Sequence, residues 1–256
     1  MISTAKPLSP SRLLAQIEHR PWPLPAGRWS MTQSWHDLLF AHWPLPVDVL
    51  RPLLPPSLEI DTFEGEAWLG VIPFGMRNVR ARYTPALPWF SAFPELNVRT
   101  YVTLGGKPGV FFFGLEAANP IAVRAARRWF YLPYFDARMT IGYDENTVAY
   151  SSHRTHHNSP PAEFSGRYHP NSKIEPATRG TIEYWLTERY CLYAERKDGS
   201  LFRGEIHHTP WPLQRAEAEI NTNSMASAAQ IELPDTPPLL HFSENLDVLV
   251  WPLTPV

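Results

Sequence analysis

The stretch that decides the fold is a predicted strand, and with the turn before it the segment reads Ser91-Ala92-Phe93-Pro94-Glu95-Leu96-Asn97-Val98-Arg99-Thr100-Tyr101-Val102. Side chains of a strand point alternately to opposite faces of its sheet. One face therefore carries the apolar or small residues Leu96, Val98, Thr100 and Val102, and the other carries Glu95, Asn97, Arg99 and Tyr101. An acid, an amide, a guanidinium and a phenol thus lie in one row. Such a row is either a solvated sheet face or the polar wall of a pocket.

The composition predicts a globular protein that binds neither nucleic acid nor a membrane. Of its 256 residues, 44% are apolar and 19% are charged, so the chain can bury a sizeable core. The formal net charge is −2, with 23 basic and 25 acidic residues, which gives no electrostatic footprint for nucleic acid or an anionic bilayer. The longest apolar run, from Val110 to Leu115, is far shorter than the roughly 20 residues of a spanning helix.

The cysteine content and the first residues predict the compartment. The single cysteine, Cys191, excludes an intramolecular disulfide and a multi-cysteine metal site. The first 26 residues lack an apolar core followed by a small-residue cleavage site, so no signal peptide is predicted. We therefore expect a cytoplasmic protein with no cofactor and no bound metal. A homo-oligomer is compatible with the sequence, because 10 Trp, 13 Phe and 10 Tyr can cover a subunit interface as well as a core.

The scattered prolines, 28 in all, predict many short elements in one α+β, strand-rich domain. Residues 1–26 are predicted to be an extension with a short helix capped by Ser9, and residues 27–256 to be a single domain. Strands are predicted at about 29–43, 58–63, 67–74, 95–102, 110–115, 136–143, 146–152, 189–196, 201–208, 213–220 and 239–250. Helices are predicted at 47–54, 120–131 and 222–230, and long loops at 75–94 and 153–180, the second with a short strand near 164–168.

Histidines offer two weaker candidate sites. The run His153-Arg154-Thr155-His156-His157 has no cysteine or carboxylate partner at metal spacing nearby, so we interpret it as exposed loop histidines rather than metal ligands. In the strand of residues 35–43, His36, Leu38, Phe40 and His42 are predicted to share a face, which suits an apolar pocket wall with few polar groups. A half-buried strand whose histidines bond locally explains the same pattern equally well.

Two resemblances to known families follow from quoted motifs. Residues 47–61 are similar to the early helix and following strand start of acetoacetate decarboxylase, and Ser91-Ala92-Phe93-Pro94 is similar to that family's "S-A-Y-P" sequence. Roughly residues 20–253 resemble the YqjF-like family of bacterial proteins, which is defined by a domain of unknown function. That second resemblance is carried by Trp35-His36-Asp37, Asp61-Thr62-Phe63-Glu64-Gly65, Asn97-Val98-Arg99-Thr100-Tyr101-Val102, Gly106-Lys107-Pro108-Gly109-Val110, Leu132-Pro133-Tyr134 and His208-x-Pro210-Trp211-Pro212-Leu213.

The resemblances imply the acetoacetate decarboxylase-like fold, an antiparallel sheet or barrel curled around an interior, ligand-sized cavity. They do not imply its lysine chemistry. In the decarboxylase, paired lysines follow the proline and the first forms a Schiff base, whereas the matching positions here are Glu95 and Leu96. The four lysines of this chain are Lys6, Lys107, Lys173 and Lys197, all in predicted turns, polar loops or the N-terminal extension. We therefore expect the fold and the cavity without Schiff-base decarboxylation.

The polar row gives the leading functional hypothesis, a cavity that binds a small organic anion. Arg99 is predicted to hold a carboxylate of the ligand in a bidentate fork. Glu95 is the candidate acid or base for lyase-like chemistry, with a pKa that is either raised by burial or lowered by Arg99. Asn97, Tyr101 and His36 are predicted to orient the ligand.

Two alternatives use the same residues. The absence of a nucleophile paired with a base is equally typical of a non-catalytic binding or sensor module. In the third interpretation, Glu95 and Arg99 form a structural ion pair in a barrel closed by side chains. Removing Arg99 would then cost roughly 3–5 kcal/mol, because a buried charge is left alone. Exposure of Glu95, Arg99 and Tyr101 to bulk water would contradict the pocket hypothesis.

Overall fold

The computed structural model describes residues 7–87 and 90–256, and most of its elements are strands. The strands are β1 (Met31–Leu45), β2 (Glu59–Ile60), β3 (Ala67–Ala81), β4 (Phe93–Leu104), β5 (Lys107–Ala117), β6 (Tyr134–Asp144), β7 (Thr147–Arg154), β8 (Glu163–Pro170), β9 (Cys191–Glu195), β10 (Leu201–His207), β11 (Leu213–Asn223), β12 (Leu239–Val250) and β13 (Thr254–Pro255). The helices are α1 (Pro10–Leu14), α2 (Val47–Leu50), α3 (Pro120–Trp129) and α4 (Ile182–Thr187), with 3₁₀ turns η1 (Arg51–Leu53) and η2 (Ser227–Ala229). This arrangement confirms the predicted strand-rich α+β class.

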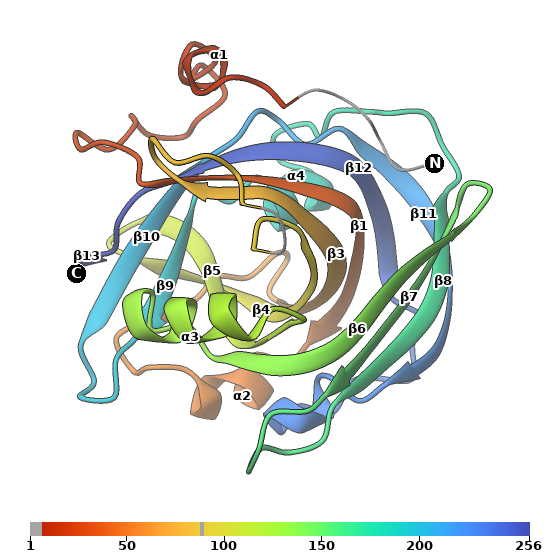
Figure 1. Ribbon diagram of the computed structural model, residues 1–256. Coiled ribbons are helices and arrows are strands. Elements are labelled where there is room, and N and C mark those ends of the chain that lie inside the picture. The colour runs from red at the N-terminus through yellow and green to blue at the C-terminus, as the bar shows by residue number, and fades with distance from the viewer. Residues whose placement is uncertain (1–6, 88–89) are drawn as a thin grey trace.

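Paired strands form a ring in one half of the molecule. From β4 the hydrogen-bonded neighbours run through β3, β1, β12, β10, β9 and β5, and β5 pairs with β4 again. These pairs are antiparallel except β5 with β9. The strands β6, β7, β8 and β11 continue the sheet from β5 round to β12 as a second curved wall. Figure 1 shows the curled sheet, with α3 lying across the opening of the ring.

The main hydrophobic core lies between strands of the ring, such as β4, and the second wall. Leu96 and Val98 of β4 pack there in one cluster with Val148 of β7 and Phe164 of β8. The predicted alternation along β4 is thereby confirmed on its apolar face. The opposite, polar face of β4 consequently points into the ring.

Several predicted elements differ in the structure. β3 continues to Ala81, through the first residues of the loop predicted at 75–94. The strands predicted at 58–63 and 67–74 do not form a hairpin ladder, because in the described chain β2 pairs with β4 and only an isolated antiparallel bridge joins Phe63 to Glu66. Residues 222–230 contain the end of β11 and the short η2 turn in place of a helix, and α4 was not predicted. These errors share a cause, since tertiary pairing overrides weak local propensity.

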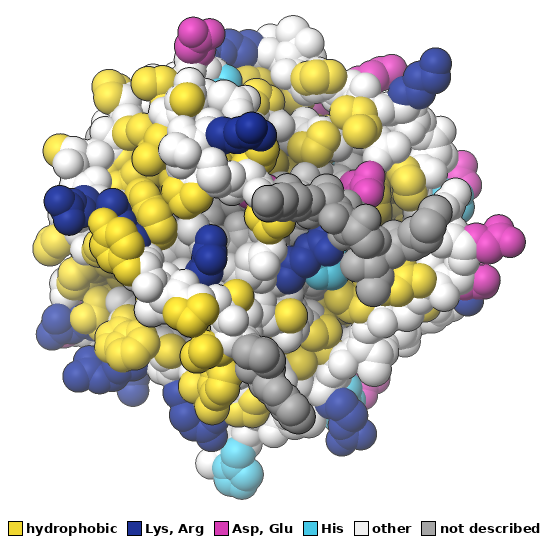
Figure 2. Space-filling view, turned by 45° about the horizontal axis from the view of Figure 1, so that its top comes forward, with side chains coloured by type: hydrophobic (Ala, Val, Ile, Leu, Met, Phe, Trp, Pro, Cys, Tyr) yellow, Lys and Arg dark blue, Asp and Glu magenta, His cyan; other side chains and the backbone are white. Residues whose placement is uncertain are grey.

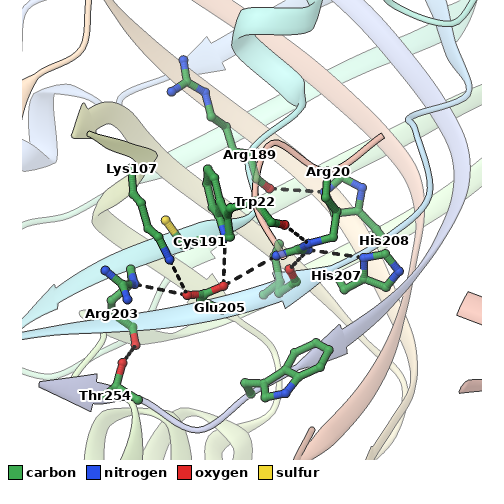
Figure 3. A network of polar contacts seen from close by, with 12 residues as sticks. Arg20, Trp22, Lys107, Arg189, Cys191, Arg203, Glu205, His207, His208 and Thr254 are labelled. Carbon is green, nitrogen blue, oxygen red and sulfur yellow. Dashed lines mark hydrogen bonds and ion pairs between the residues drawn. The ribbon is translucent and has the colours of Figure 1, made fainter. Parts of the chain in front are cut away.

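The segment before β1 is anchored to the sheet by polar contacts. Ser9 caps α1 by accepting from the Arg12 amide, as predicted. Glu205 on β10 accepts from Trp22 Nε1 at 3.0 Å and pairs with Arg20 at 3.6 Å, as Figure 3 shows. Of the helices that the structure describes, none has both the length and the apolarity to cross a membrane.

Candidate functional site

The ring encloses a cavity of about 500 Å³, which all seven of its strands and α3 help to line. Its wall is mainly apolar, with aromatic rings contributed by Trp35, Phe74 and Phe112. A concave, mostly apolar site with a few polar groups is the usual form of a small-molecule site. The polar groups of the cavity come chiefly from β4 and from the segment around β9 and β10.

The polar row of β4 forms one wall of this cavity. Glu95, Asn97 and Arg99 line it and are only 4%, 6% and 8% exposed, respectively. Tyr101, the last member of the row, is completely buried behind Arg99. The row therefore belongs to a pocket wall and not to a solvated sheet face.

Arg99 carries a charge that the described residues leave without a carboxylate partner. Its Nη2 donates to the Leu186 carbonyl at 3.3 Å and to the Tyr101 hydroxyl at 3.4 Å, both long hydrogen bonds. Its Nε is buried and has no acceptor in the described chain. A guanidinium has five N–H donors, so most of its capacity is unused. A buried cation without a counter-charge is unfavourable, and an anion in the cavity would relieve that cost.

Arg189 brings a second guanidinium to the same place. Its Nη1 donates to Asp61 at 2.5 Å and its Nε to the Trp185 carbonyl at 2.6 Å, while its Nη2 is buried without an acceptor among the described residues. Both guanidinium groups contact the Tyr101 ring, whose centroid is 5.6 Å from Cζ of Arg99 and 4.8 Å from Cζ of Arg189. Asp61 neutralises one of the two charges, so the pair keeps a net positive charge.

Sequence reasoning missed Arg189, because it stands between α4 and β9 in no recognisable motif. The excess of nineteen arginines over four lysines was the only available signal, and it does not select a residue. His208 also lines the cavity and contacts the backbone of Arg189, with its Nε2 3.2 Å from the Arg189 carbonyl oxygen. Burial lowers the pKa of His208 to about 4, so this imidazole is neutral at pH 7 and adds no charge.

Tyr101 and His42 fix the position of Arg99 from behind. The Tyr101 oxygen accepts from Arg99 and lies 2.6 Å from Nε2 of His42. Burial, followed by the nearby charge of Arg99, lowers the pKa of His42 well below its usual value. The uncharged His42 ring therefore places no second cation beside Arg99. Tyr101, which was predicted to orient a ligand, lies outside the cavity lining and contacts Arg99.

Glu95 is a buried carboxyl group at the other end of the row. Burial raises the pKa of Glu95 to about 8, and the hydrogen bond from Tyr134, at 3.0 Å to Oε2, opposes this only in part. Tyr150 holds the strand here by donating to the Glu95 carbonyl at 2.6 Å. Of the two effects that the sequence left open, burial therefore dominates. At pH 7 most of this carboxyl group is protonated and can donate toward the cavity.

The structural ion pair of the third interpretation is not formed. Four residues along a strand separate the Cα atoms of Glu95 and Arg99 by roughly 13 Å. Glu95 bonds to Tyr134, whereas Arg99 bonds to Tyr101 and Leu186, and no ion pair in the described ranges joins the two residues. The row therefore presents an acid and a cation as separate groups.

His36 does not contribute to the cavity wall, and this expectation was wrong. A bulge at Asp37, with φ of +53°, inserts one extra residue into β1 and shifts its register against β3. One extra residue reverses the side to which side chains point. Trp35 and Leu38 therefore line the cavity, while the His36 ring lies over Gly75 and its Nδ1 is 2.8 Å from the Asp37 carboxylate.

Neither an amine nor an active thiol lines the cavity in the described chain. Lys107 points to Glu205, with Nζ 3.2 Å from Oε1 (Figure 3). Lys173 and Lys197 are exposed, and Lys6 lies outside the described residues. Burial raises the pKa of the Cys191 thiol to about 11, so it is not a thiolate near neutral pH.

The histidine run after residue 152 is divided between two surface pairs. His153 belongs to β7, not to a loop, and its Nδ1 is 2.7 Å from the Glu163 carboxylate. Nδ1 of His156 is 3.0 Å from the Asp136 carboxylate. Residues 7–87 and 90–256 contain no group of three or more His, Cys, Asp or Glu side chains arranged to hold a metal ion.

Solved structures of low sequence identity share this fold. An acetoacetate decarboxylase matches with a TM-score of 0.60 at 13% identity, covering 97% of this chain and 98% of that one. The acetoacetate decarboxylase of Legionella pneumophila matches with a TM-score of 0.58 at 15% identity over 93% of each chain. The enduracididine biosynthesis enzyme MppR, complexed with pyruvate, matches with a TM-score of 0.61 at 11% identity over 98% of each chain. These similarities confirm the expected acetoacetate decarboxylase-like fold.

Sequence comparisons identify the family. The Bacillus subtilis (strain 168) protein "Uncharacterized protein YqjF" is 48% identical over 230 residues, which cover 90% of this chain and 94% of that protein. The profile of the DUF2071 family, "Uncharacterized conserved protein", matches residues 32–247, which include the whole polar row of β4. The chain therefore belongs to the DUF2071 family and is similar throughout its matched length to YqjF.

Proposed function

We propose that the cavity binds a small organic anion, a carboxylate held by Arg99 with Arg189 beside it. The observation that carries this proposal is the guanidinium of Arg99, which is buried against the cavity without a carboxylate partner among the described residues. A carboxylate can take up two parallel N–H donors of such a group. Nε of Arg99 and Nη2 of Arg189 have no acceptor in the described chain, so protein acceptors do not saturate either guanidinium.

Glu95 favours a second candidate function, acid–base catalysis on the bound anion. A carboxyl group with a pKa of about 8 keeps a proton to give at neutral pH and can take one back. The solved structures of similar fold are an enzyme complexed with pyruvate and acetoacetate decarboxylases. Their small oxo acids are therefore the first compounds to test, although no lysine lines this cavity in the described chain. A ligand recovered unchanged would favour the non-catalytic alternative.

The test is a thermal-shift panel of small carboxylic and oxo acids on three proteins. These are the wild type, Arg99→Met, and Arg138→Met as the control at an exposed arginine on β6. At a ligand concentration of 100 Kd, binding stabilises a protein by about 2.7 kcal/mol. We expect that gain for the wild type and Arg138→Met, and none for Arg99→Met. Equal stabilisation of all three proteins would contradict the role of Arg99.

The same variants separate the anion site from a structural role. Without ligand, Arg99→Met removes an unpaired buried charge and keeps an apolar stem of similar length, so its free energy of unfolding should stay within about 1 kcal/mol of wild type. A structural role predicts a loss of roughly 3–5 kcal/mol. A loss of that size, together with no acid that binds wild type, would overturn the proposal.

A further inference from the structure

The cavity is larger and more apolar than a small oxo acid requires. Its volume of about 500 Å³ lies in the range typical of sites for drug-sized ligands. Leu38, Ile72 and Phe74 contribute apolar side chains that a three- or four-carbon acid at Arg99 would leave without partners. Apolar side chains that line an unfilled space lack dispersion contacts with a ligand, so a small acid would bind less tightly than one that fills the cavity. The wall therefore suits a ligand with an apolar body attached to its anionic group.

The two ends of the cavity differ in burial. Arg99 and Arg189 form its buried end. At the other end lie Leu87, Ile121 and Trp129, which line the cavity and are nevertheless 54%, 56% and 68% exposed at the surface. The lining thus includes both the two buried arginines and exposed apolar side chains on and near α3. The exposure of these lining residues marks this end as the mouth of the cavity.

The charge around the mouth favours an anion. Residues 77–87, 90–94 and 118–135, which flank it, contain six arginines and no Asp or Glu. Figure 2 shows Lys and Arg side chains interspersed with hydrophobic ones over the lower left of the face it presents, whereas acidic side chains gather at the top and right. A positive rim raises the local concentration of anions and speeds their entry. Arg80 also lines the cavity but is exposed to water. The buried cations that can pair with the anionic group are therefore Arg99 and Arg189.

We propose, on the basis of the anion binding proposed above, that the ligand is an amphiphilic monocarboxylate bound head first. Its carboxylate contacts Arg99 and Arg189, and its alkyl or aryl body fills the cavity toward α3. Asn97, two residues before Arg99 on the same face of β4, also lines the cavity and is the polar side chain next to the proposed head group.

The experiment is isothermal titration of the full chain with straight-chain monocarboxylates from acetate to decanoate. We expect affinity to rise about fourfold per methylene until the cavity is full. Methyl decanoate should bind far more weakly than decanoate, because its head carries no charge. Arg99→Met should abolish the binding of all the acids, whereas Arg80→Met should weaken it only modestly.

A pair of α3 variants tests the path of the apolar body. Ala125→Trp narrows the cavity from the helix and should weaken decanoate more than butyrate. Arg128→Trp places the same side chain on the exposed side of α3 and, although it removes one rim arginine, should leave the ratio of the decanoate and butyrate affinities unchanged. A greater effect of Arg80→Met than of Arg99→Met would reverse the proposed orientation and overturn it.

The outcomes distinguish this inference from the proposed function. Affinity that depends on Arg99 but stays constant from acetate to decanoate would overturn the amphiphilic ligand and leave anion binding standing. Equal binding of decanoate and its methyl ester, unaffected by Arg99→Met, would overturn both. Failure of every acid to bind the folded wild type at millimolar concentration would also overturn both.

Discussion

The pH dependence of stability should reveal the protonated state of Glu95. Its pKa is about 8 in the folded chain, against an ordinary value of 4.5. The folded state keeps this proton to higher pH than the unfolded state, so the stability it contributes is complete below about pH 4.5 and is lost as the pH rises through 8. A difference of about 3.5 pKa units at 1.36 kcal/mol per unit gives a loss of up to about 5 kcal/mol.

Glu95→Gln isolates this effect, because the amide has the same shape and no proton to lose. We would measure urea unfolding from pH 5 to pH 9 for the wild type, for Glu95→Gln, and for Glu66→Gln as the control at an exposed carboxylate. The stability of the wild type relative to Glu95→Gln should fall by about 1.4 kcal/mol per pH unit between pH 5 and pH 8. Glu66→Gln should follow the wild type over the same range.

Two results would refute this reasoning. Parallel curves for the wild type and Glu95→Gln would mean that Glu95 is ionised in the folded chain throughout the range. A relative stability that rises with pH would mean that a cation such as Arg99 holds the carboxylate, as in the ion-pair interpretation.

Two further substitutions test the packing around the site by urea unfolding at pH 7. Gly75→Ala would put a methyl group onto the His36 ring and should cost about 1–3 kcal/mol, whereas Gly27→Ala, which meets no atom within 4 Å, should be nearly neutral. Arg154→Met leaves buried Glu116, now 2.5 Å from Nη2 of Arg154, without its partner and should cost about 3–5 kcal/mol. Adding Glu116→Leu to that variant should recover most of the lost stability. No recovery would mean that Arg154→Met destabilises the protein by disturbing the packing and not by leaving Glu116 unpaired.

The polar row was predictable because alternation along a strand is a local property. Once β4 is a strand and Leu96 and Val98 face the core, Glu95, Asn97 and Arg99 must face the other way, whatever lies there. His36 does not follow the alternation predicted for β1, because alternation holds only along an unbroken strand. The bulge at Asp37 depends on the pairing of β1 with β3, which no pattern within β1 reveals.

Arg189 was unpredictable for a different reason. Its position beside Arg99 is created by the parallel pairing of β5 with β9, two strands about eighty residues apart in sequence. Arg189 therefore lines the cavity because of how the strands pair in the ring, and the residues next to it in the sequence do not indicate this. The sequence also left the sign of the Glu95 pKa shift open, because the distance from Glu95 to Arg99 and the depth of burial are both consequences of the fold.

Glu95 stands at the position that matches the first of the paired lysines in the acetoacetate decarboxylase resemblance, and one physical effect links the two. Burial in an apolar cavity disfavours the charged form of any ionisable group, so it lowers the pKa of a lysine and raises that of a glutamate. The environment that would make a lysine a neutral nucleophile makes Glu95 a neutral acid, with a pKa of about 8. The same desolvated position would therefore hold a neutral amine when it carries a lysine and a neutral acid when it carries a glutamate. On this argument, Glu95→Lys should create an amine of lowered pKa in the same cavity, and borohydride trapping with pyruvate would show whether it forms a Schiff base.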